Sequence, residues 1–267
     1  MTRRDGPGNL TVVDRGSSVT VRGLASLVVA NLRLYVREPI GTFFTLAFPV
    51  MFVLIFGAIY GNEPQDMFDG YGSMDISMPA YTALILGSVG LLGVAINTSS
   101  YREAGILRRF RMTPLRPLVY IAADVTANLI MTLTGMVGVL VVGWLLYRVR
   151  FEGQAVSVFL AVILSGTAMF AVGYLIAGLA PNARAAQVIG MVVLYPMLFL
   201  SGAAIPLEVM PDSVRTISDY LPLTYVVRLL RGLWFGEPWG SLLLETGVLV
   251  GVLVICTAIA VRLFRWE

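Results

Sequence analysis

Six continuous apolar stretches occupy most of this 267-residue chain. Each is close to 20 residues or longer, and a helix of about 20 residues rises about 30 Å, the thickness of a bilayer's hydrocarbon core. Charged residues make up only 13% of the sequence, too few to cover a water-soluble fold of this length. The stretches lack the alternation of barrel strands, so they predict an all-α integral membrane protein with six transmembrane helices. The predicted spans are about 42–60, 80–100, 119–146, 156–180, 188–205 and 241–262.

Arginine supplies every basic residue of the chain, and its distribution predicts the orientation. With a cytoplasmic N-terminus, the inner segments hold Arg3, Arg4, Arg15, Arg22, Arg33, Arg37, Arg102, Arg108, Arg109, Arg111, Arg116, Arg184, Arg262 and Arg265. The outer segments hold only Arg148, Arg150, Arg215, Arg228 and Arg231. Because cytoplasmic loops are enriched in basic residues, we expect a multi-pass protein of the cell inner membrane with both termini in the cytoplasm.

The chain ahead of the first span divides into two parts. Residues 1–18 are polar and rich in glycine, which predicts a disordered cytoplasmic tail. Residues 19–41 predict an amphipathic helix at the inner membrane surface, with arginines on one face and Pro39 ending it. The alternative is a simple extension of the first span. Residues 42–267 then form a single transmembrane domain.

The segment 201–240, before the last span, is punctuated by four prolines and is not an ordinary loop. Pro211 and Pro222 fit the starts of two short helices, at 212–220 and 223–235. Both are too short to span, so we expect interfacial or re-entrant helices on the outer side. The second has Val226, Leu229, Leu230 and Leu233 on one side. Trp234 and Trp239 are expected to anchor it at headgroup depth.

No catalytic site is evident in the sequence. It contains no histidine, no nucleophile elbow, no cluster of metal ligands and no phosphate-binding glycine-rich loop. We therefore expect no catalytic residue, no metal and no cofactor bound by this chain, and no nucleic-acid partner. The single cysteine, Cys256, is expected to be an apolar filler in the last span.

A few polar residues fall within or beside the apolar spans and are candidates for a substrate cavity. Asp124 lies one to two turns inside the inner boundary of the third span, which suits either a substrate or proton site or a carboxylate paired with Arg116 or wetted by solvent. Polar groups in apolar helices commonly bond to a neighbouring helix instead. The candidate set is Asn97, Asp124, Asn128, Tyr174 and Tyr195.

The inner loop between the second and third spans, Tyr101–Pro117, has the sequence YREAGILRRFRMTPLRP. As a helix it would present apolar and charged side chains together, before Thr113-Pro114 and Arg116-Pro117 turn the chain back. Such a surface suits insertion into a groove on a soluble partner. The alternative is that the loop is basic only because the orientation requires it.

The order of residues in this loop resembles a family signature. REAGILRRFRMTP is similar to R-E-x-G-T-L-R-R-L-x-x-T-P, which follows the second span in type-2 ABC exporter permeases of the daunorubicin-resistance-like group. The sequence departs at Ile106 and Phe110, where threonine and leucine are common. The resemblance implies that the loop docks a separate ABC ATP-binding subunit. The implied docking residues are Arg102, Glu103, Gly105, Leu107, Arg108, Arg109, Thr113 and Pro114.

The same resemblance implies a function and an assembly. This chain would be the permease subunit of an ATP-driven exporter of lipophilic or amphiphilic compounds, such as a drug, an antibiotic or a lipid. ATP and Mg²⁺ would bind in the partner ATPase, and a second permease subunit would complete a homodimer or heterodimer in the lipid bilayer. Two alternatives remain: the same machinery exporting a polysaccharide or lipid-linked glycan, or a stand-alone secondary transporter, channel or membrane anchor.

Overall fold

The structure, a computed structural model, describes residues 15–37, 42–68, 70–106, 117–205, 207 and 210–263. Its elements in chain order are α1 (Arg15–Arg37), η1 (Phe43–Ala47), α3 (Phe48–Tyr60), η2 (Asp66–Phe68), α4 (Ser73–Ser88), η3 (Val89–Val94), α5 (Ala95–Glu103), α7 (Pro117–Tyr147), α8 (Ala155–Leu179), α9 (Ala183–Leu200), α10 (Asp212–Ser218), α11 (Pro222–Trp234), η5 (Trp239–Leu242) and α12 (Leu243–Leu263). Among these described residues no strand occurs beyond one isolated bridge, Pro64 to Gly72. The predicted all-α membrane fold is confirmed.

Five of the described helices are long and apolar enough to cross a membrane. They are Ser73–Glu103, Ile121–Tyr147, Ala155–Leu179, Ala183–Leu200 and Trp239–Leu263. The first predicted span, 42–60, is a shorter apolar helix, Thr45–Tyr60, so the count of six spans stays a prediction. The α1 helix begins at Arg15, inside the segment 1–18 that the sequence predicted to be disordered. Residues 1–14 lie outside the described residues.

One continuous helix, Ser73–Glu103, forms the centre of the bundle and is named here the central helix. It joins α4, η3 and α5, and 89% of its most apolar window is buried, against 28% for Ile121–Tyr147 and 11% for Trp239–Leu263. The other helices therefore pack around it. In a bilayer, the exposed apolar faces of α7 and α12 would contact lipid.

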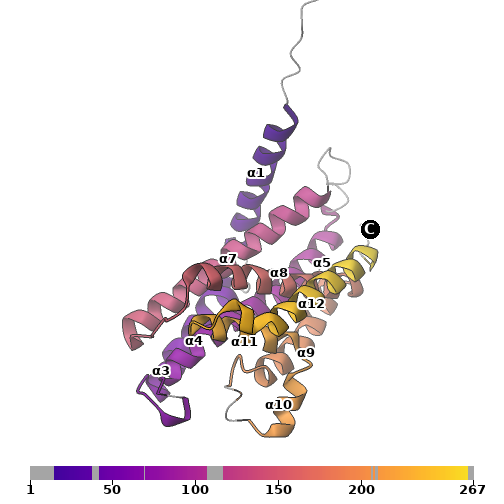
Figure 1. The fold of residues 1–267 in the computed structure, drawn as a ribbon. Coiled ribbons are helices and arrows are strands. Elements are labelled where there is room, and N and C mark those ends of the chain that lie inside the picture. The colour runs from indigo at the N-terminus through magenta and orange to yellow at the C-terminus, as the bar shows by residue number, and fades with distance from the viewer. Residues whose placement is uncertain are drawn as a thin grey trace, which may run out of the picture.

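The ends of the bundle carry different parts of the chain (Figure 1). Four helix ends lie toward one end of the bundle: the start of α1, the end of α5, the start of α7 and the end of α12. This end is named the α5 end. The connection from α3 to α4 and the helix α10 lie at the opposite end, named the α10 end. The described helix ends that the sequence predicted to face the cytoplasm therefore lie toward the same end of the bundle.

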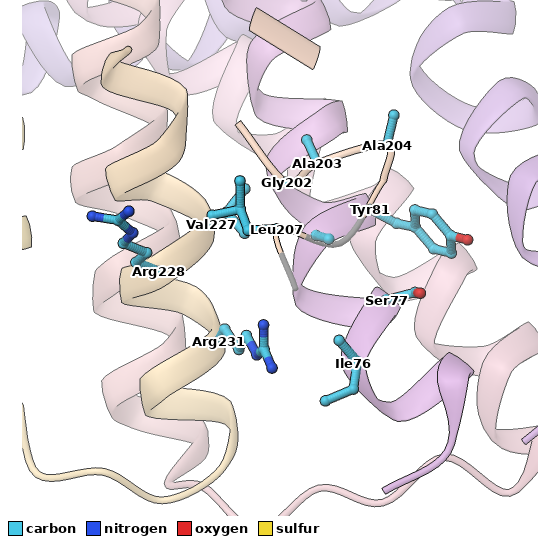
Figure 2. Close-up of a pocket in the computed structure, with 11 residues that line it drawn as sticks. Ile76, Ser77, Tyr81, Gly202, Ala203, Ala204, Leu207, Val227, Arg228 and Arg231 are labelled. Carbon is cyan, nitrogen blue, oxygen red and sulfur yellow. The ribbon is translucent and has the colours of Figure 1, made fainter. Parts of the chain in front are cut away.

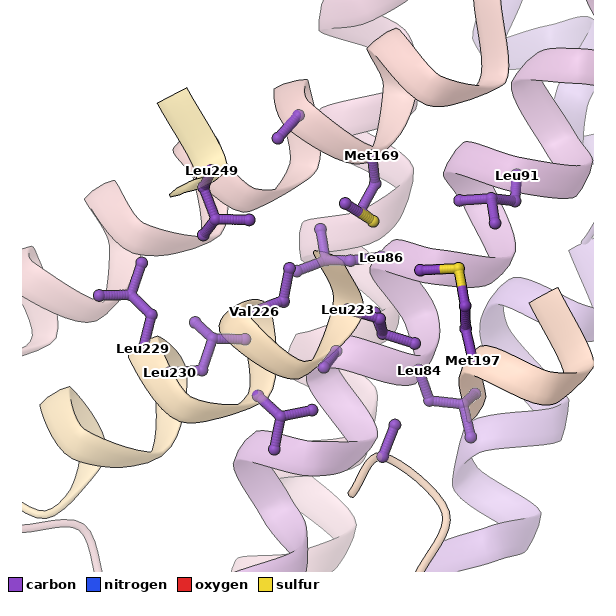
Figure 3. Packing of buried hydrophobic residues seen from close by; sticks show 14 of the residues in the cluster. Leu84, Leu86, Leu91, Met169, Met197, Leu223, Val226, Leu229, Leu230 and Leu249 are labelled. Atoms are coloured by element: carbon purple, nitrogen blue, oxygen red, sulfur yellow. The ribbon is translucent and has the colours of Figure 1, made fainter. Parts of the chain in front are cut away.

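The α11 helix packs into the core rather than resting on its surface (Figure 3). Val226, Leu229, Leu230 and Leu233 are all buried, which confirms the predicted apolar side of this helix. Trp234 is also buried, at 4% exposure, and its indole Nε1 donates to the Arg150 carbonyl at 2.9 Å. The predicted role of Trp234 as a headgroup anchor is therefore wrong. Tertiary packing against Phe151 draws the ring inward, with centroids 4.8 Å apart.

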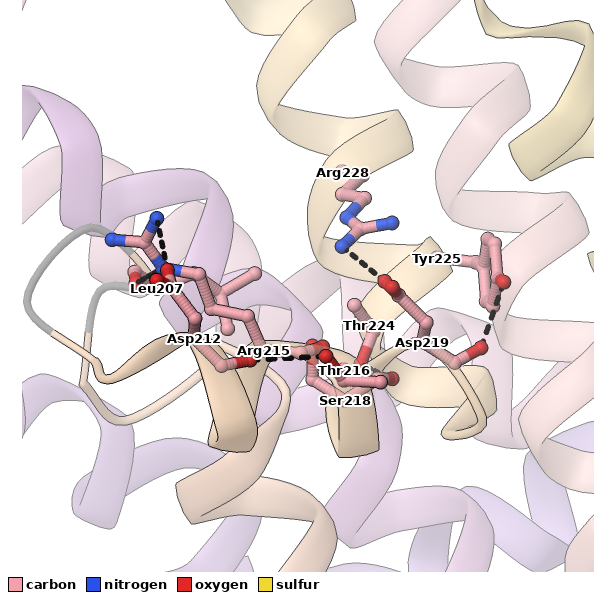
Figure 4. A network of polar contacts seen from close by, with 9 residues as sticks. All are labelled: Leu207, Asp212, Arg215, Thr216, Ser218, Asp219, Thr224, Tyr225 and Arg228. Carbon is pink, nitrogen blue, oxygen red and sulfur yellow. Dashed lines mark hydrogen bonds and ion pairs between the residues drawn. The ribbon is translucent and has the colours of Figure 1, made fainter.

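A polar network joins α10 to α11 at the α10 end (Figure 4). Arg228 pairs with Asp219 at 2.6 Å, and Arg215 pairs with Asp212 at 3.7 Å. Thr224 closes the network by donating to the Ser218 carbonyl at 2.6 Å, so the turn between the two helices is fixed by side chains as well as by backbone.

Tyr71, in the α3–α4 connection, provides a test of the contacts at the α10 end. Its hydroxyl donates to Glu152 Oε2 at 3.0 Å, and this hydrogen bond to a carboxylate raises the pKa of Tyr71 above 10.0. A raised pKa means that the contact stabilises the fold below about pH 10 and is lost as the pH rises through the folded-state value. Glu152→Gln is expected to lower the Tyr71 pKa. Tyrosinate absorbance, taken as the difference from Tyr71→Phe, measures it, and an unchanged pKa would contradict the assignment.

Candidate functional site

The candidate site is the point at the α5 end where the central helix stops. Gly105 follows the helix with φ +65°, a left-handed conformation that glycine adopts without strain, and its N–H donates to the Arg102 carbonyl at 3.0 Å. The Ala104 N–H donates to the Ser100 carbonyl at 2.9 Å. This turn ends the helix directly after Arg102 and Glu103 and fixes the backbone from which both side chains project.

Arg102 reaches the end of α8. Its Nη1 donates to the Ala177 carbonyl at 2.9 Å and its Nη2 donates to the Ala180 carbonyl. Carbonyls in the last turn of a helix have no partner within the helix and carry the negative end of its dipole. A guanidinium with two donors is suited to this position because it satisfies two carbonyls and matches their partial charge.

Glu103 reaches the start of α9. Its Oε1 accepts from the Ala183 N–H at 2.8 Å, the first residue of that helix. Asn182 supplies the ordinary cap, since its Oδ1 accepts from the Ala185 N–H at 2.7 Å. The first turn of α9 therefore has two side-chain acceptors, one local and one from the central helix. A carboxylate at a helix N-terminus also lies at the positive end of the dipole.

Together the two residues bridge the turn between α8 and α9, and this arrangement is named the helix-end clamp. The cation of Arg102 lies at a C-terminus and the anion of Glu103 at an N-terminus, so each charge has the sign that its helix end favours. The clamp ties the end of the central helix to a turn nearly 80 residues later in the sequence, with separations of 75, 78 and 80 positions for its three contacts.

The predicted docking residues fall into two groups. Arg102, Glu103 and Gly105 are described, and the clamp and the left-handed turn account for all three. The remaining docking residues lie outside the described residues: Leu107, Arg108, Arg109, Thr113 and Pro114. The contacts of Arg102 and Glu103 with α8 and α9 could not be predicted from the sequence, because no local pattern relates the two segments.

The predicted substrate-cavity residues are brought together only in part. Tyr174 donates to Asp124 Oδ2 at 2.5 Å, and Asn128 Nδ2 donates to the Asp124 carbonyl at 2.9 Å and to its Oδ2 at 3.3 Å. Asp124 and Asn128 are buried, so these three form a polar contact between α7 and α8. Tyr195 lies elsewhere, 44% exposed on α9, and Asn97 is half-buried on α5.

Two adjoining cavities open at the α10 end, around the start of the central helix. The larger, 230 Å³, is lined by Phe56, Tyr60, Phe68 and Tyr81 among others. The smaller, 40 Å³, lies between α4 and α11 and is drawn in Figure 2, where Arg231 points toward Ile76 and Arg228 points away. Ser77, Tyr81 and Ala204 line both cavities, so the two lie side by side.

A third cavity, of 550 Å³, lies between α7 and α8 near Trp234. Its lining is apolar throughout, with Met136, Trp144, Val158 and Phe159 among its residues. Leu133, Val137 and Leu140 extend the same wall along α7. Cavities of this chemistry suit apolar molecules, including lipid chains, better than hydrophilic solutes.

The fold and this site define a class: an all-helical membrane protein whose buried central helix ends in a polar clamp at one face of the bundle. Sequence comparison identifies the family. Residues 22–235 match the ABC-2 type transporter family, which covers most of the chain. The chain therefore belongs to the ABC-2 type transporter family.

Individual relatives agree with this assignment. The chain is 25% identical to the daunorubicin resistance ABC transporter permease protein DrrB1 of Streptomyces coeruleorubidus, over 81% of this chain and 77% of the relative. It is 31% identical to nodulation protein J of Rhizobium leguminosarum bv. viciae, over 39% of this chain and 40% of the relative. It is 22% identical to the probable multidrug ABC transporter permease YbhR of Escherichia coli K12, over 62% of this chain and 46% of the relative. The chain thus spans less than half the length of two of these three relatives.

Proposed function

We propose that this chain is the membrane-spanning subunit of an ATP-driven exporter, located in the cell inner membrane with its α5 end in the cytoplasm. The observation that carries the proposal is the α5 end itself. Four helix ends lie there: the end of the central helix, the start of α7, the start of α1 and the end of α12. The helix-end clamp fixes the start of the loop that begins at Ala104. A soluble partner that bound this loop would pull directly on the most buried helix of the bundle.

The proposed partner is a separate ABC ATP-binding subunit, which would hold ATP and Mg²⁺. Its contacts would be with the loop that includes Leu107, Arg108, Arg109, Thr113 and Pro114. Binding of the ATPase transmits energy only if the ATPase prefers one conformation of the membrane subunit over another, and this preference must be reciprocal. Cargo bound in the membrane subunit should therefore change the rate of ATP hydrolysis. A second permease subunit, identical or different, would complete the assembly.

The proposed cargo is lipophilic or amphiphilic. The 230 Å³ cavity is lined by aromatic rings and the 550 Å³ cavity by aliphatic and aromatic side chains, so both favour apolar molecules. Two of the relatives are named for drug resistance or multidrug transport, which agrees with this chemistry. Export of a polysaccharide or lipid-linked glycan is the second candidate, favoured by the aromatic wall of Phe56, Tyr60 and Tyr81, since sugar rings also stack on aromatic side chains.

Reconstitution tests the proposal. Proteoliposomes containing this chain and its partner ATPase are loaded with daunorubicin, a fluorescent amphiphile, or with a lipid-linked glycan in a parallel sample. We expect daunorubicin to move only when both subunits and ATP are present, and ATP hydrolysis to change when daunorubicin is added. Movement of the glycan alone would favour the second candidate. Gradient-driven flux through this chain without the ATPase would contradict both and would support a secondary transporter.

A further inference from the structure

We infer that Arg102 and Glu103 are positioning residues that make the α8–α9 turn move together with the docking loop, rather than residues that bind the ATPase. The inference rests on the proposed function and assigns a distinct task to the first two residues of the loop signature. The geometry points to it because both side chains are engaged inside this chain, on two different helix ends.

The hydrogen-bonding groups of Arg102 and Glu103 are already occupied within this chain. Two guanidinium nitrogens of Arg102 bond to carbonyls of α8, and one carboxylate oxygen of Glu103 bonds to the first N–H of α9. Hydrogen bonds that involve a charged group are stronger than neutral ones, and helix ends left without partners are costly. An ATPase that recruited these side chains would first have to strip both helix ends of their partners.

The charges of Arg102 and Glu103 match the helix ends that these residues contact. The order along the chain is cation then anion, and the order of helix ends across the turn is C-terminus then N-terminus. The two therefore align, Arg102 with the end of α8 and Glu103 with the start of α9. Exchanging the two residues would keep the net charge of the loop but would place each charge against a helix end of its own sign.

The α8–α9 turn connects two helices that pack closely against the central helix. From the clamp, α8 and α9 run back along the central helix and touch its backbone closely at η3. A Cβ added at Gly173 of α8 would lie 2.0 Å from the Gly90 carbonyl oxygen, and one added at Gly190 of α9 would lie 2.5 Å from the Leu91 carbonyl oxygen. Both helices are thus held to the central helix at two levels, by the clamp at its end and by backbone contact at η3. Motion of the loop passes to α8 and α9 as one unit.

The central helix connects the helix-end clamp to the cavities at the α10 end. Its start supplies Ser77 and Tyr81 to the two adjoining cavities at the α10 end, while its last two residues form the clamp. Displacement at the α5 end therefore has a continuous helical path to the lining of a cavity. The clamp decides whether α8 and α9 follow that displacement or are left behind.

The test measures two quantities for each variant: binding of the ATPase, and coupling, which is the amount of daunorubicin moved per ATP hydrolysed. Glu103→Ala, Arg102→Ala, Glu103→Gln and the exchanged pair Arg102→Glu with Glu103→Arg are each assembled with the ATPase in proteoliposomes. We expect the two alanine variants to retain the ATPase at wild-type stoichiometry but to move about tenfold less daunorubicin per ATP hydrolysed, the size expected for one lost charge-assisted hydrogen bond. Glu103→Gln should restore most of the coupling, because its amide oxygen still accepts from Ala183. The exchanged pair should be at least as uncoupled as either alanine variant.

Arg184→Gln, at an exposed position on the same turn, is the matched control and should keep wild-type coupling.

A covalent tie provides a rescue that separates the two roles. Cys256 is the only cysteine of the chain, so a Cys256→Ala background permits site-directed pairs. Ala104→Cys and Pro181→Cys, both exposed, lie on either side of the clamp and can be joined by a short bifunctional thiol reagent. In the Glu103→Ala variant this bridge should restore transport per ATP, and cleaving the bridge should abolish it again.

The results of these experiments distinguish a positioning role of Arg102 and Glu103 from a docking role. Loss of the ATPase from the alanine variants, with no rescue by the bridge, would show that Arg102 and Glu103 are docking contacts and would overturn the inference. Full transport per ATP in both alanine variants would overturn it as well. If an alanine variant does not fold, Glu103→Gln still decides: ATPase binding with near wild-type transport per ATP supports the positioning role, and loss of the ATPase contradicts it. Absence of ATP-dependent transport in the wild-type complex would instead contradict the proposed function.

Discussion

Replacing Gly173 with alanine is expected to destabilise the folded protein by about 3 kcal/mol or more. The new methyl carbon would lie 2.0 Å from the Gly90 carbonyl oxygen, 3.0 Å from the Gly90 carbonyl carbon and 3.1 Å from Val94 Cβ. The nearest atoms belong to the backbone of the buried central helix, so no side-chain rotation relieves the clash. The helices must separate, and the dispersion contacts along α8 weaken with them.

Gly251→Ala is the matched control for this prediction. Gly251 lies within α12, and an added Cβ there would meet nothing within 4 Å. Because alanine favours the helix over glycine by about 1 kcal/mol, this variant should be neutral or slightly stabilised. Thermal unfolding in detergent measures both. Equal transition temperatures for the two variants would show that the contact at η3 is looser than the structure indicates.

Replacing Asp75 with alanine is the second change with a large expected effect, again about 3 kcal/mol. This carboxylate is 1% exposed at the start of the central helix. Its Oδ1 accepts from the Arg150 N–H at 2.8 Å and from Asn62 Nδ2 at 3.1 Å, and its Oδ2 accepts from the Gly72 N–H at 3.1 Å. Alanine would leave these donors without their acceptor in a buried place. The α3–α4 connection and the α7–α8 connection would lose one of the contacts that join them.

Asp219→Ala provides the comparison, because Asp219 forms an ion pair with Arg228 while its side chain is 50% exposed. Exposed pairs of this kind contribute about 0 to 1 kcal/mol. Unfolding in a graded mixture of mild detergent and dodecyl sulfate should therefore separate the two variants clearly. A smaller loss for Asp75→Ala than for Asp219→Ala would mean that the buried carboxylate does not organise this end of the bundle.

Apolar composition was sufficient to predict most helices, because membrane insertion depends on local hydrophobicity over about 20 residues. The sided pattern of α11 was equally readable from the spacing of its leucines. The central helix begins at Ser73, ahead of the span predicted from about residue 80, since Ser73, Asp75 and Ser77 lower the local hydropathy. Only the tertiary contacts of Asp75 explain why this polar turn is buried.

Prediction of the candidate site was also incomplete, for a different reason. The loop signature marked Arg102, Glu103 and Gly105 as important, and a left-handed glycine directly after a helix is a local feature. The partners of Arg102 and Glu103 are backbone groups of another helix pair, and backbone groups carry no sequence signal. The polar contact among Asp124, Asn128 and Tyr174 likewise required the packing of α7 on α8.

A cryo-EM structure of this chain in complex with its ATPase subunit tests the central claim most directly. We expect the ATPase to contact the loop beyond Ala104 at the α5 end, while Arg102 and Glu103 keep their bonds to α8 and α9. An ATPase bound to another face, with that loop free of contacts, would contradict it.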